Sequence, residues 1–202
     1  MFFNEIVEAG ALGFIQKANM PITLLYDRKY CYKITPDNLP SVCDIKLDPQ
    51  QYDIIRQKVV DKKDFLLEFD IRNHFRVGPV KYHNVIGIIR GKKHPDEYVM
   101  LGGHLDSYDS ATGAVDDGNG CSVVMEAARL LAECGARPER SIMFCLWTGE
   151  EFGLLGSKYF VENRTVPYES ISNYFNRDGG PTLATSITVP PAMYEDFVKV
   201  CK

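Results

Sequence analysis

Four short polar motifs, each beside glycine, stand out in this chain. They are Gly103-His104-Leu105-Asp106-Ser107, Asp116-Asp117-Gly118-Asn119-Gly120, Thr148-Gly149-Glu150-Glu151 and Asn176-Arg177-Asp178-Gly179-Gly180. Together they offer one imidazole and several carboxylates, which are ligand types that zinc binds readily. A carboxylate that stays off the metal can move a proton to or from a reacting water. The motifs therefore indicate a metal-dependent hydrolytic site.

Most of these motifs follow a short apolar run that we predict to be a buried strand. Strands are expected over Tyr98–Gly102, Ser141–Trp147 and Ile171–Asn176, and the first, third and fourth motifs come just after them. Loops at the carboxyl ends of strands line the ligand crevice of an α/β sheet. The second motif precedes a helix predicted by apolar spacing over Val123–Leu131, and a helix N-terminus favours nearby anions. We therefore expect all four motifs to converge at one edge of a sheet.

Each motif taken alone also has an ordinary structural interpretation. A histidine after a strand is usually a satisfied structural residue, and two aspartates before a helix usually provide an N-cap. Two glutamates in a row are usually a solvated turn, and an aspartate before two glycines is usually a turn residue. The convergence of four such motifs at one sheet edge favours the metal site over these separate explanations.

The remaining pattern predicts an α/β fold. Further strands are expected over Phe65–Ile71 and Tyr82–Ile89, and further helices over Leu155–Val161 and Pro191–Cys201. Strands that alternate with helices give a sheet covered by helices on both faces. We predict a three-layer sandwich with a mostly parallel central sheet, incomplete at both ends.

A charge-rich run, Arg56–Asp64, indicates a boundary between two modules. Residues 1–60 form a small α/β segment in which Asp48, followed by proline, begins a helix. Residues 61–202 carry the four polar motifs and most of the apolar mass. The chain is thus expected to contain a minor and a major module.

Composition excludes several other classes of protein. The 202-residue chain has a net charge of −4, which argues against nucleic acid as a partner. No apolar stretch reaches the roughly 18 residues that a membrane-spanning helix requires. None of the six cysteines lies in a C-x-x-C pair, so a zinc–thiolate site is not expected. We expect Cys121, Cys134 and Cys145 to be buried free thiols.

The motifs as a set resemble a known family. Gly-His-Leu-Asp-Ser, the Gly-Ala-x-Asp-Asp-Gly-x-Gly run and Trp-Thr-Gly-Glu-Glu-x-Gly are similar to the co-catalytic zinc exopeptidases of metallopeptidase family 28. Arg137–Arg140 is most similar to the carboxypeptidase Q branch of that family. The resemblance covers about residues 80–180, while Gly10–Ile15 and Leu39–Val42 resemble the end of a protease-associated domain.

The resemblance implies a site for two zinc ions. The implied metal ligands are His104, Asp116, Glu151 and Asp178. Asp116 is implied to bridge the two ions, while His104 and Asp178 complete one site and Glu151 binds the other. Glu150 is implied to be the general base, and Asp106 is implied to orient the His104 imidazole. The peptide bond after Asp116 is implied to be cis.

The implied activity is that of a zinc-dependent aminopeptidase or dipeptidase, which hydrolyses peptides or dipeptides with a water activated by two metals. An extracellular or periplasmic location is implied, and the oligomeric state is open.

The family has a fifth ligand, a histidine downstream of Asp178, whereas His74, His83 and His94 all precede His104. We therefore expect a truncated catalytic domain, weakly active or inactive as it stands. The alternatives are a single-zinc glutaminyl cyclase and an inactive binding fragment of the same fold.

Overall fold

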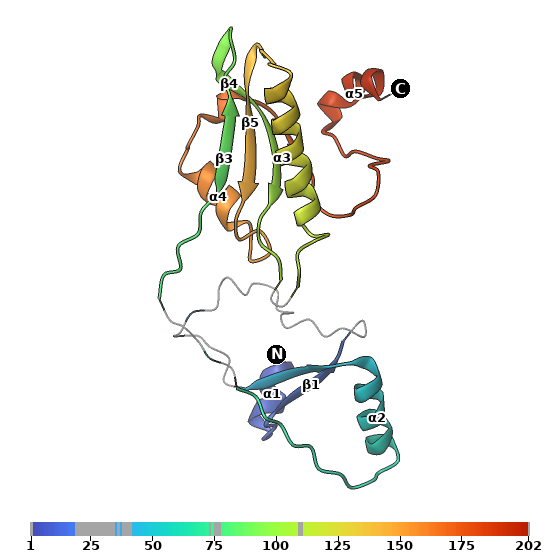
Figure 1. Cartoon of the computed structure of the whole chain (residues 1–202). Coiled ribbons are helices and arrows are strands. Elements are labelled where there is room, and N and C mark those ends of the chain that lie inside the picture. Colours follow the sequence, from blue (N-terminus) through green and yellow to red (C-terminus); the bar gives the residue numbers. More distant parts are fainter. Residues whose placement is uncertain are drawn as a thin grey trace.

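A computed structural model describes residues 2–18, 35, 37, 42–72, 74, 78–108 and 111–201. Within these residues, two separate β-sheets are formed (Figure 1). In the smaller sheet, β1 (Gly13–Lys17) and β2 (Cys43–Leu47) run parallel. The larger sheet has four strands in the order β3-β5-β4-β6.

The four-stranded sheet is mostly parallel. Its strands are β3 (Val85–Ile89), β4 (His94–His104), β5 (Arg140–Trp147) and β6 (Ile171–Asn176). β4 pairs in parallel with both β5 and β6, and only β3 runs antiparallel to its neighbour β5. The carboxyl ends of β4, β5 and β6 consequently meet at the same edge of the sheet.

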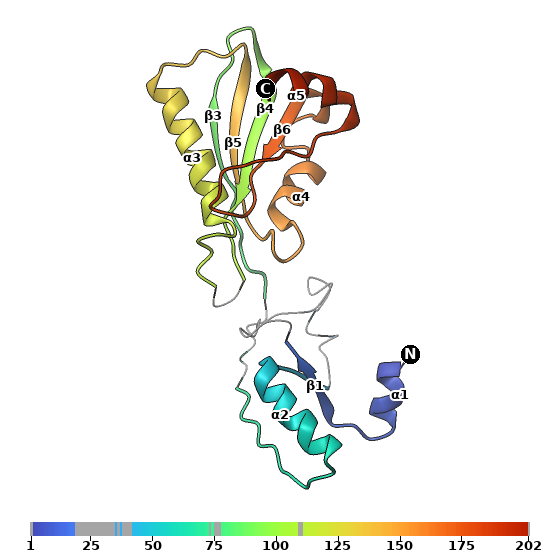
Figure 2. The same ribbon diagram turned by 90° about the vertical axis from the view of Figure 1, so that its right-hand side faces the viewer.

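Helices cover both faces of this sheet. α3 (Gly118–Glu133) and α4 (Leu155–Glu162) lie on opposite sides of it (Figure 2). On the α3 face, Val124 packs in a buried cluster with Phe144. On the α4 face, Phe160 packs in a second cluster with Cys145. Because successive residues of β5 point to opposite faces, one strand contributes to both cores. The predicted α/β fold with a mostly parallel central sheet is confirmed.

The N-terminal segment has α1 (Phe2–Glu8) before β1 and α2 (Pro49–Val60) after β2. The α2 helix starts as predicted, since Asp48 Oδ1 accepts a 2.8 Å hydrogen bond from the backbone N–H of Gln50. The predicted module boundary near residue 60 falls at the end of this helix.

Two sequence-based expectations are wrong. The strand predicted over Phe65–Ile71 is absent: residues 63–72 have no regular secondary structure, and the Leu66 side chain is 99% exposed. A segment of alternating apolar residues forms a strand only where the edge of another strand can hydrogen-bond with its backbone N–H and C=O groups. Cys134 was expected to be buried but is exposed, because it caps the C-terminal end of α3. Cys121 and Cys145 are buried free thiols as expected.

The other elements differ from expectation mainly at their ends. The strand expected from Tyr82 starts at Val85. The helix expected from Pro191 consists of a 3₁₀ turn, η4 (Pro191–Met193), followed by α5 (Tyr194–Val200). Another 3₁₀ turn, η3 (Tyr168–Ser170), precedes β6. Residues 39–41 of the segment that resembles a protease-associated domain lie outside the described residues.

Candidate metal centre

A cluster of one imidazole and two carboxylates lies at the carboxyl edge of the sheet. His104 ends β4, Asp116 precedes α3, and Asp178 follows β6. One ligand atom from each residue can be chosen so that all three atoms lie within 4.8 Å of one another. His104 Nε2 is 2.9 Å from Asp116 Oδ1 and 3.6 Å from Asp178 Oδ1. Three sequence-predicted ligands are thus brought together.

The His104 ring is buried, with 3% of the residue exposed, and its two nitrogens have different partners. Nδ1 lies 2.9 Å from the backbone carbonyl oxygen of Asp106. A carbonyl oxygen can only accept, so Nδ1 carries a hydrogen and donates it there. That hydrogen bond leaves Nε2, which faces both carboxylates, as the nitrogen able to bind a metal. The donor set therefore fits a zinc ion.

The resemblance implies that Asp106 orients the imidazole, and two groups of Asp106 lie near the ring. Its carbonyl oxygen lies 2.9 Å from Nδ1, whereas its carboxylate Oδ1 lies 3.8 Å from Nδ1. The two carboxylate oxygens accept hydrogen bonds from the backbone N–H groups of Glu150, at 2.9 Å, and Glu151, at 3.1 Å. Asp106 therefore holds the ring with its main chain and the glutamate turn with its side chain.

The protonation of His104 reflects this surrounding negative charge. Burial lowers the pKa of the imidazole, but the hydrogen bond to the Asp106 carbonyl raises it, and so does the charge of Glu150. The net effect is a pKa raised above 6.5. The neighbouring carboxylates thus favour the protonated ring, and a metal that binds Nε2 competes with a proton there.

The pKa values of the two glutamates reflect the same cluster. Burial is the largest cause that raises the pKa of Glu150, and the charges of Asp178, Asp106 and Asp116 raise it further, against the opposing effect of His104. Burial also raises the pKa of Glu151, followed by the charge of Asp116. Neither glutamate belongs to the three-residue group found among the described residues. The excess of neighbouring acid groups is the kind of electrostatic strain that a divalent cation relieves.

The sequence did not reveal the role of Asp117 beyond helix capping. The residue is 1% exposed, and the peptide bond that joins it to Asp116 is cis, as the resemblance implied. Its Oδ1 caps α3 by accepting from the Gly120 N–H at 2.9 Å. It also accepts backbone hydrogen bonds from His104 and Gly179, at 3.0 and 3.3 Å. The signal available in the sequence was the set of glycines that let these backbones approach.

Two further side chains hold the loop that carries Asp178. Asn119 Nδ2 donates to the carbonyl oxygens of Gly179, at 3.4 Å, and Gly180. Arg177 Nη2 donates to the carbonyl oxygens of Gly180 and Thr182, both at 3.0 Å. The loop after β6 is thus fixed from α3 and from within, which restricts where the Asp178 carboxylate can lie.

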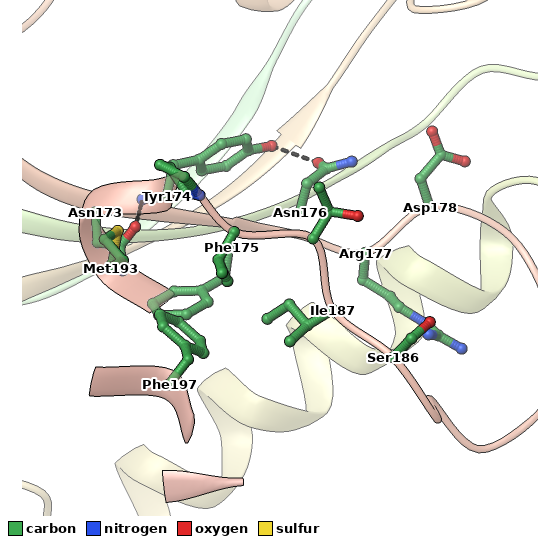
Figure 3. Close-up of a pocket in the computed structure, with 13 residues that line it drawn as sticks. Asn173, Tyr174, Phe175, Asn176, Arg177, Asp178, Ser186, Ile187, Met193 and Phe197 are labelled. Atoms are coloured by element: carbon green, nitrogen blue, oxygen red, sulfur yellow. Dashed lines mark hydrogen bonds between the residues drawn. The ribbon is translucent and has the colours of Figure 1, made fainter. Parts of the chain in front are cut away.

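A cavity of about 480 Å³ adjoins the cluster along β6 (Figure 3). It is lined by β6 and by residues 186–197, with Phe175 and Phe197 packed at 6.0 Å between ring centroids. Asp178 also lines it, and its carboxylate points away from those two rings (Figure 3). The cavity thus has a mixed polar and apolar lining and borders the metal cluster through a single residue, Asp178.

The other histidines lie outside the cluster. His74, His83 and His94 are all exposed. His94 starts β4, at the other end of the strand from His104, and its Nδ1 lies 3.4 Å from a Glu97 carboxylate oxygen. Within the part of the chain that the structure describes, none joins a group able to hold a metal. No described helix is both long and apolar enough to cross a lipid bilayer.

Comparisons with known proteins agree with this geometry. The family model for peptidase family M28 matches residues 84–193, more than half of the chain. Carboxypeptidase Q from Rattus norvegicus is 35% identical over 119 residues, which cover 56% of this chain and 25% of that protein. A probable glutamate carboxypeptidase from Arabidopsis thaliana is 42% identical over 127 residues, covering 59% and 18%. The chain thus spans about a quarter or less of these relatives' length.

A solved structure is similar over nearly the whole chain. The peptidase M28 precursor from Shewanella amazonensis superposes with a TM-score of 0.69 at 25% sequence identity. The match covers 95% of this chain and 43% of that one.

Proposed function

We propose that this chain, which belongs to peptidase family M28, carries the zinc-binding hydrolytic site of an exopeptidase that acts on peptides or dipeptides. The observation that carries the proposal is the convergence of His104 Nε2 with the carboxylates of Asp116 and Asp178. The exopeptidase class is supported by the two carboxypeptidases to which the chain is similar.

His104, Asp116 and Asp178 are proposed to hold one zinc ion. Glu151 is proposed to share a second ion with Asp116, whose charge already raises the pKa of the Glu151 carboxyl in the metal-free chain. When bound, zinc polarises a scissile carbonyl and lowers the pKa of a nearby water. The residues contribute a fixed ring nitrogen and carboxylates that come from strand ends and from the loop before α3.

Glu150 is proposed as the general base. Burial raises the pKa of its carboxyl, and the charges of Asp178, Asp106 and Asp116 raise it further, which favours a group that can accept a proton and hold it until it is returned. In the proposed reaction Glu150 takes a proton from the attacking water and delivers it to the nitrogen of the leaving amine. The Asp106 carboxylate fixes its backbone at the start of the turn, so the base has a defined position.

The substitution Glu150→Gln tests this assignment in a form of the protein that hydrolyses peptides. Glutamine keeps the shape but cannot accept the proton, so we expect the rate to fall by about 10²–10⁴-fold. Zinc content, measured by elemental analysis, should stay the same. Glu169→Gln, on the exposed η3 turn, is the matched control and should change neither quantity.

Three outcomes separate the proposal from its alternatives. Two zinc ions per chain with release of an amino acid from a dipeptide support the exopeptidase. One zinc ion with release of ammonia from an N-terminal glutaminyl peptide supports a glutaminyl cyclase. Unchanged hydrolysis in Glu150→Gln would show that another group is the base.

A further inference from the structure

Asp117 is the one buried carboxylate among the described residues, and it makes contacts with three separate parts of the fold. Oδ2 accepts from the backbone N–H of His104 at the end of β4. Oδ1 accepts from Gly120 in the first turn of α3 and from Gly179 in the loop after β6. One side chain therefore joins a strand end, a helix start and a loop that are distant in sequence.

Two of these contacts lie at or beside a proposed zinc ligand, and the third ligand is the residue before Asp117 in the chain. His104 is itself one of the three hydrogen-bond donors. Asp116 is bonded directly to Asp117 through the cis peptide. Asp178 immediately precedes the third donor, Gly179. One carboxylate thus holds the main chain at His104 and beside Asp178, and it belongs to the residue that follows Asp116.

Close packing around Asp117 makes this arrangement specific. A Cβ atom on Gly103 would lie 2.7 Å from Asp117 Oδ2, and one on Gly120 would collide with both carboxylate oxygens. Gly179 has a φ of +78°, a conformation that side-chain-bearing residues rarely adopt. The glycines let backbone N–H groups reach a carboxylate that would be strongly disfavoured in the interior without them.

We propose that Asp117 is a positioning residue that assembles the three-ligand cluster before zinc binds, so that zinc affinity depends on its carboxylate. The proposal rests on the proposed function and deepens it. Both Asp117 oxygens are used by backbone N–H groups, so the side chain acts on the ligands through their main chain. Ligands already held in place lose less conformational entropy when the ion arrives.

A purely structural role for Asp117 predicts a different result. A helix N-cap needs only the bond to Gly120, and its loss lowers stability without altering the metal site. Asp48 provides a matched N-cap, since its Oδ1 accepts from Gln50 at the start of α2. Asp48 lies in the N-terminal segment, outside the metal cluster.

The test compares Asp117→Asn with Asp48→Asn in the full 202-residue chain. Asparagine has one acceptor oxygen, and its NH₂ group must face a backbone N–H on the other side. Zn²⁺ alone is titrated in competition with a chromophoric chelator. We expect Asp117→Asn to weaken zinc binding by about 10–100-fold, and Asp48→Asn to lower stability while the zinc Kd stays unchanged.

A second measurement does not depend on how the variant folds. Hydrogen exchange of the metal-free wild-type chain should show protected amides at His104, Gly120 and Gly179. If the Gly179 amide exchanges at the rate of an unstructured peptide until zinc is added, the metal assembles the site and the proposal is overturned.

The outcomes also separate this inference from the proposed function. A wild-type chain that binds no zinc overturns both. If the wild type and Asp117→Asn bind zinc equally tightly, the positioning role is wrong and the zinc site stands. Weaker binding confined to Asp117→Asn supports both.

Discussion

The side chain of Asp106 holds the backbone of Glu150: Oδ1 accepts a 2.9 Å hydrogen bond from the Glu150 N–H. Oδ2 does the same for Glu151 at 3.1 Å, while the carbonyl of Asp106 accepts from the His104 ring. One residue therefore couples the proposed base, a proposed ligand and the imidazole, and it does so through two chemically different groups.

The substitution Asp106→Asn separates these two groups. It removes one acceptor from the glutamate turn but keeps the carbonyl that holds His104. We therefore expect kcat for peptide hydrolysis to fall by about 10–100-fold while zinc content is retained. Steady-state kinetics and elemental analysis measure the two effects. Loss of zinc with an undisturbed turn would instead mean that the carboxylate, and not the carbonyl, orients the ring.

Sequence patterns predicted the elements whose formation depends on local apolar spacing. The strand Ile171–Asn176 was predicted with the bounds that the structure has, and the α3 helix was located by its apolar repeat. The strand predicted over Phe65–Ile71 failed because a strand also needs an edge to pair with. Local alternation does not show whether such an edge is available.

The candidate site, like the fold, could be predicted only in part from the sequence. Side chains such as His104 and Asp178 could be brought together by placing each after a strand. The contacts of Asp117 and the Asp106 carbonyl could not be predicted, because they involve backbone N–H and C=O groups. Every residue type has these groups, so the sequence carries no direct sign of which ones meet.

The pH dependence of stability offers a prediction for the metal-free chain. Burial raises the folded-state pKa of both Glu150 and Glu151 above 4.5, so the folded chain holds their protons more tightly than the unfolded chain. Their stabilising contribution is then complete below pH 4.5 and is lost as pH rises through the raised values. The pKa of His104 is raised above 6.5, so its contribution is lost in the same direction, at higher pH.

Urea unfolding midpoints across this pH range check the prediction. Without zinc, the double variant Glu150→Gln/Glu151→Gln should match the wild type below pH 4.5 and become relatively more stable as pH rises above it. Glutamine resembles the protonated acid at every pH, so the difference between the two proteins isolates these carboxyls. A difference that does not vary with pH would show that the glutamates titrate normally.

The close approach of β4 to α3 gives a prediction about packing. In Gly103→Ala the new Cβ would lie 2.7 Å from Asp117 Oδ2 and 3.1 Å from the backbone nitrogen of Cys121. The helix backbone cannot yield as a flexible side chain would, so we expect a loss of about 1–3 kcal/mol in the free energy of unfolding. Zinc binding should weaken as well, because the displaced carboxylate also holds His104.

Gly87→Ala is the matched control for this substitution. Gly87 lies in β3 of the same sheet, and a Cβ there would meet nothing within 4 Å. Alanine restricts the unfolded chain more than glycine does, so this variant should be neutral or slightly more stable, with an unchanged zinc Kd. Equal destabilisation by both substitutions would mean that the loss reflects glycine in a strand generally. A loss confined to Gly103→Ala would place its cause at the contact between β4 and the start of α3.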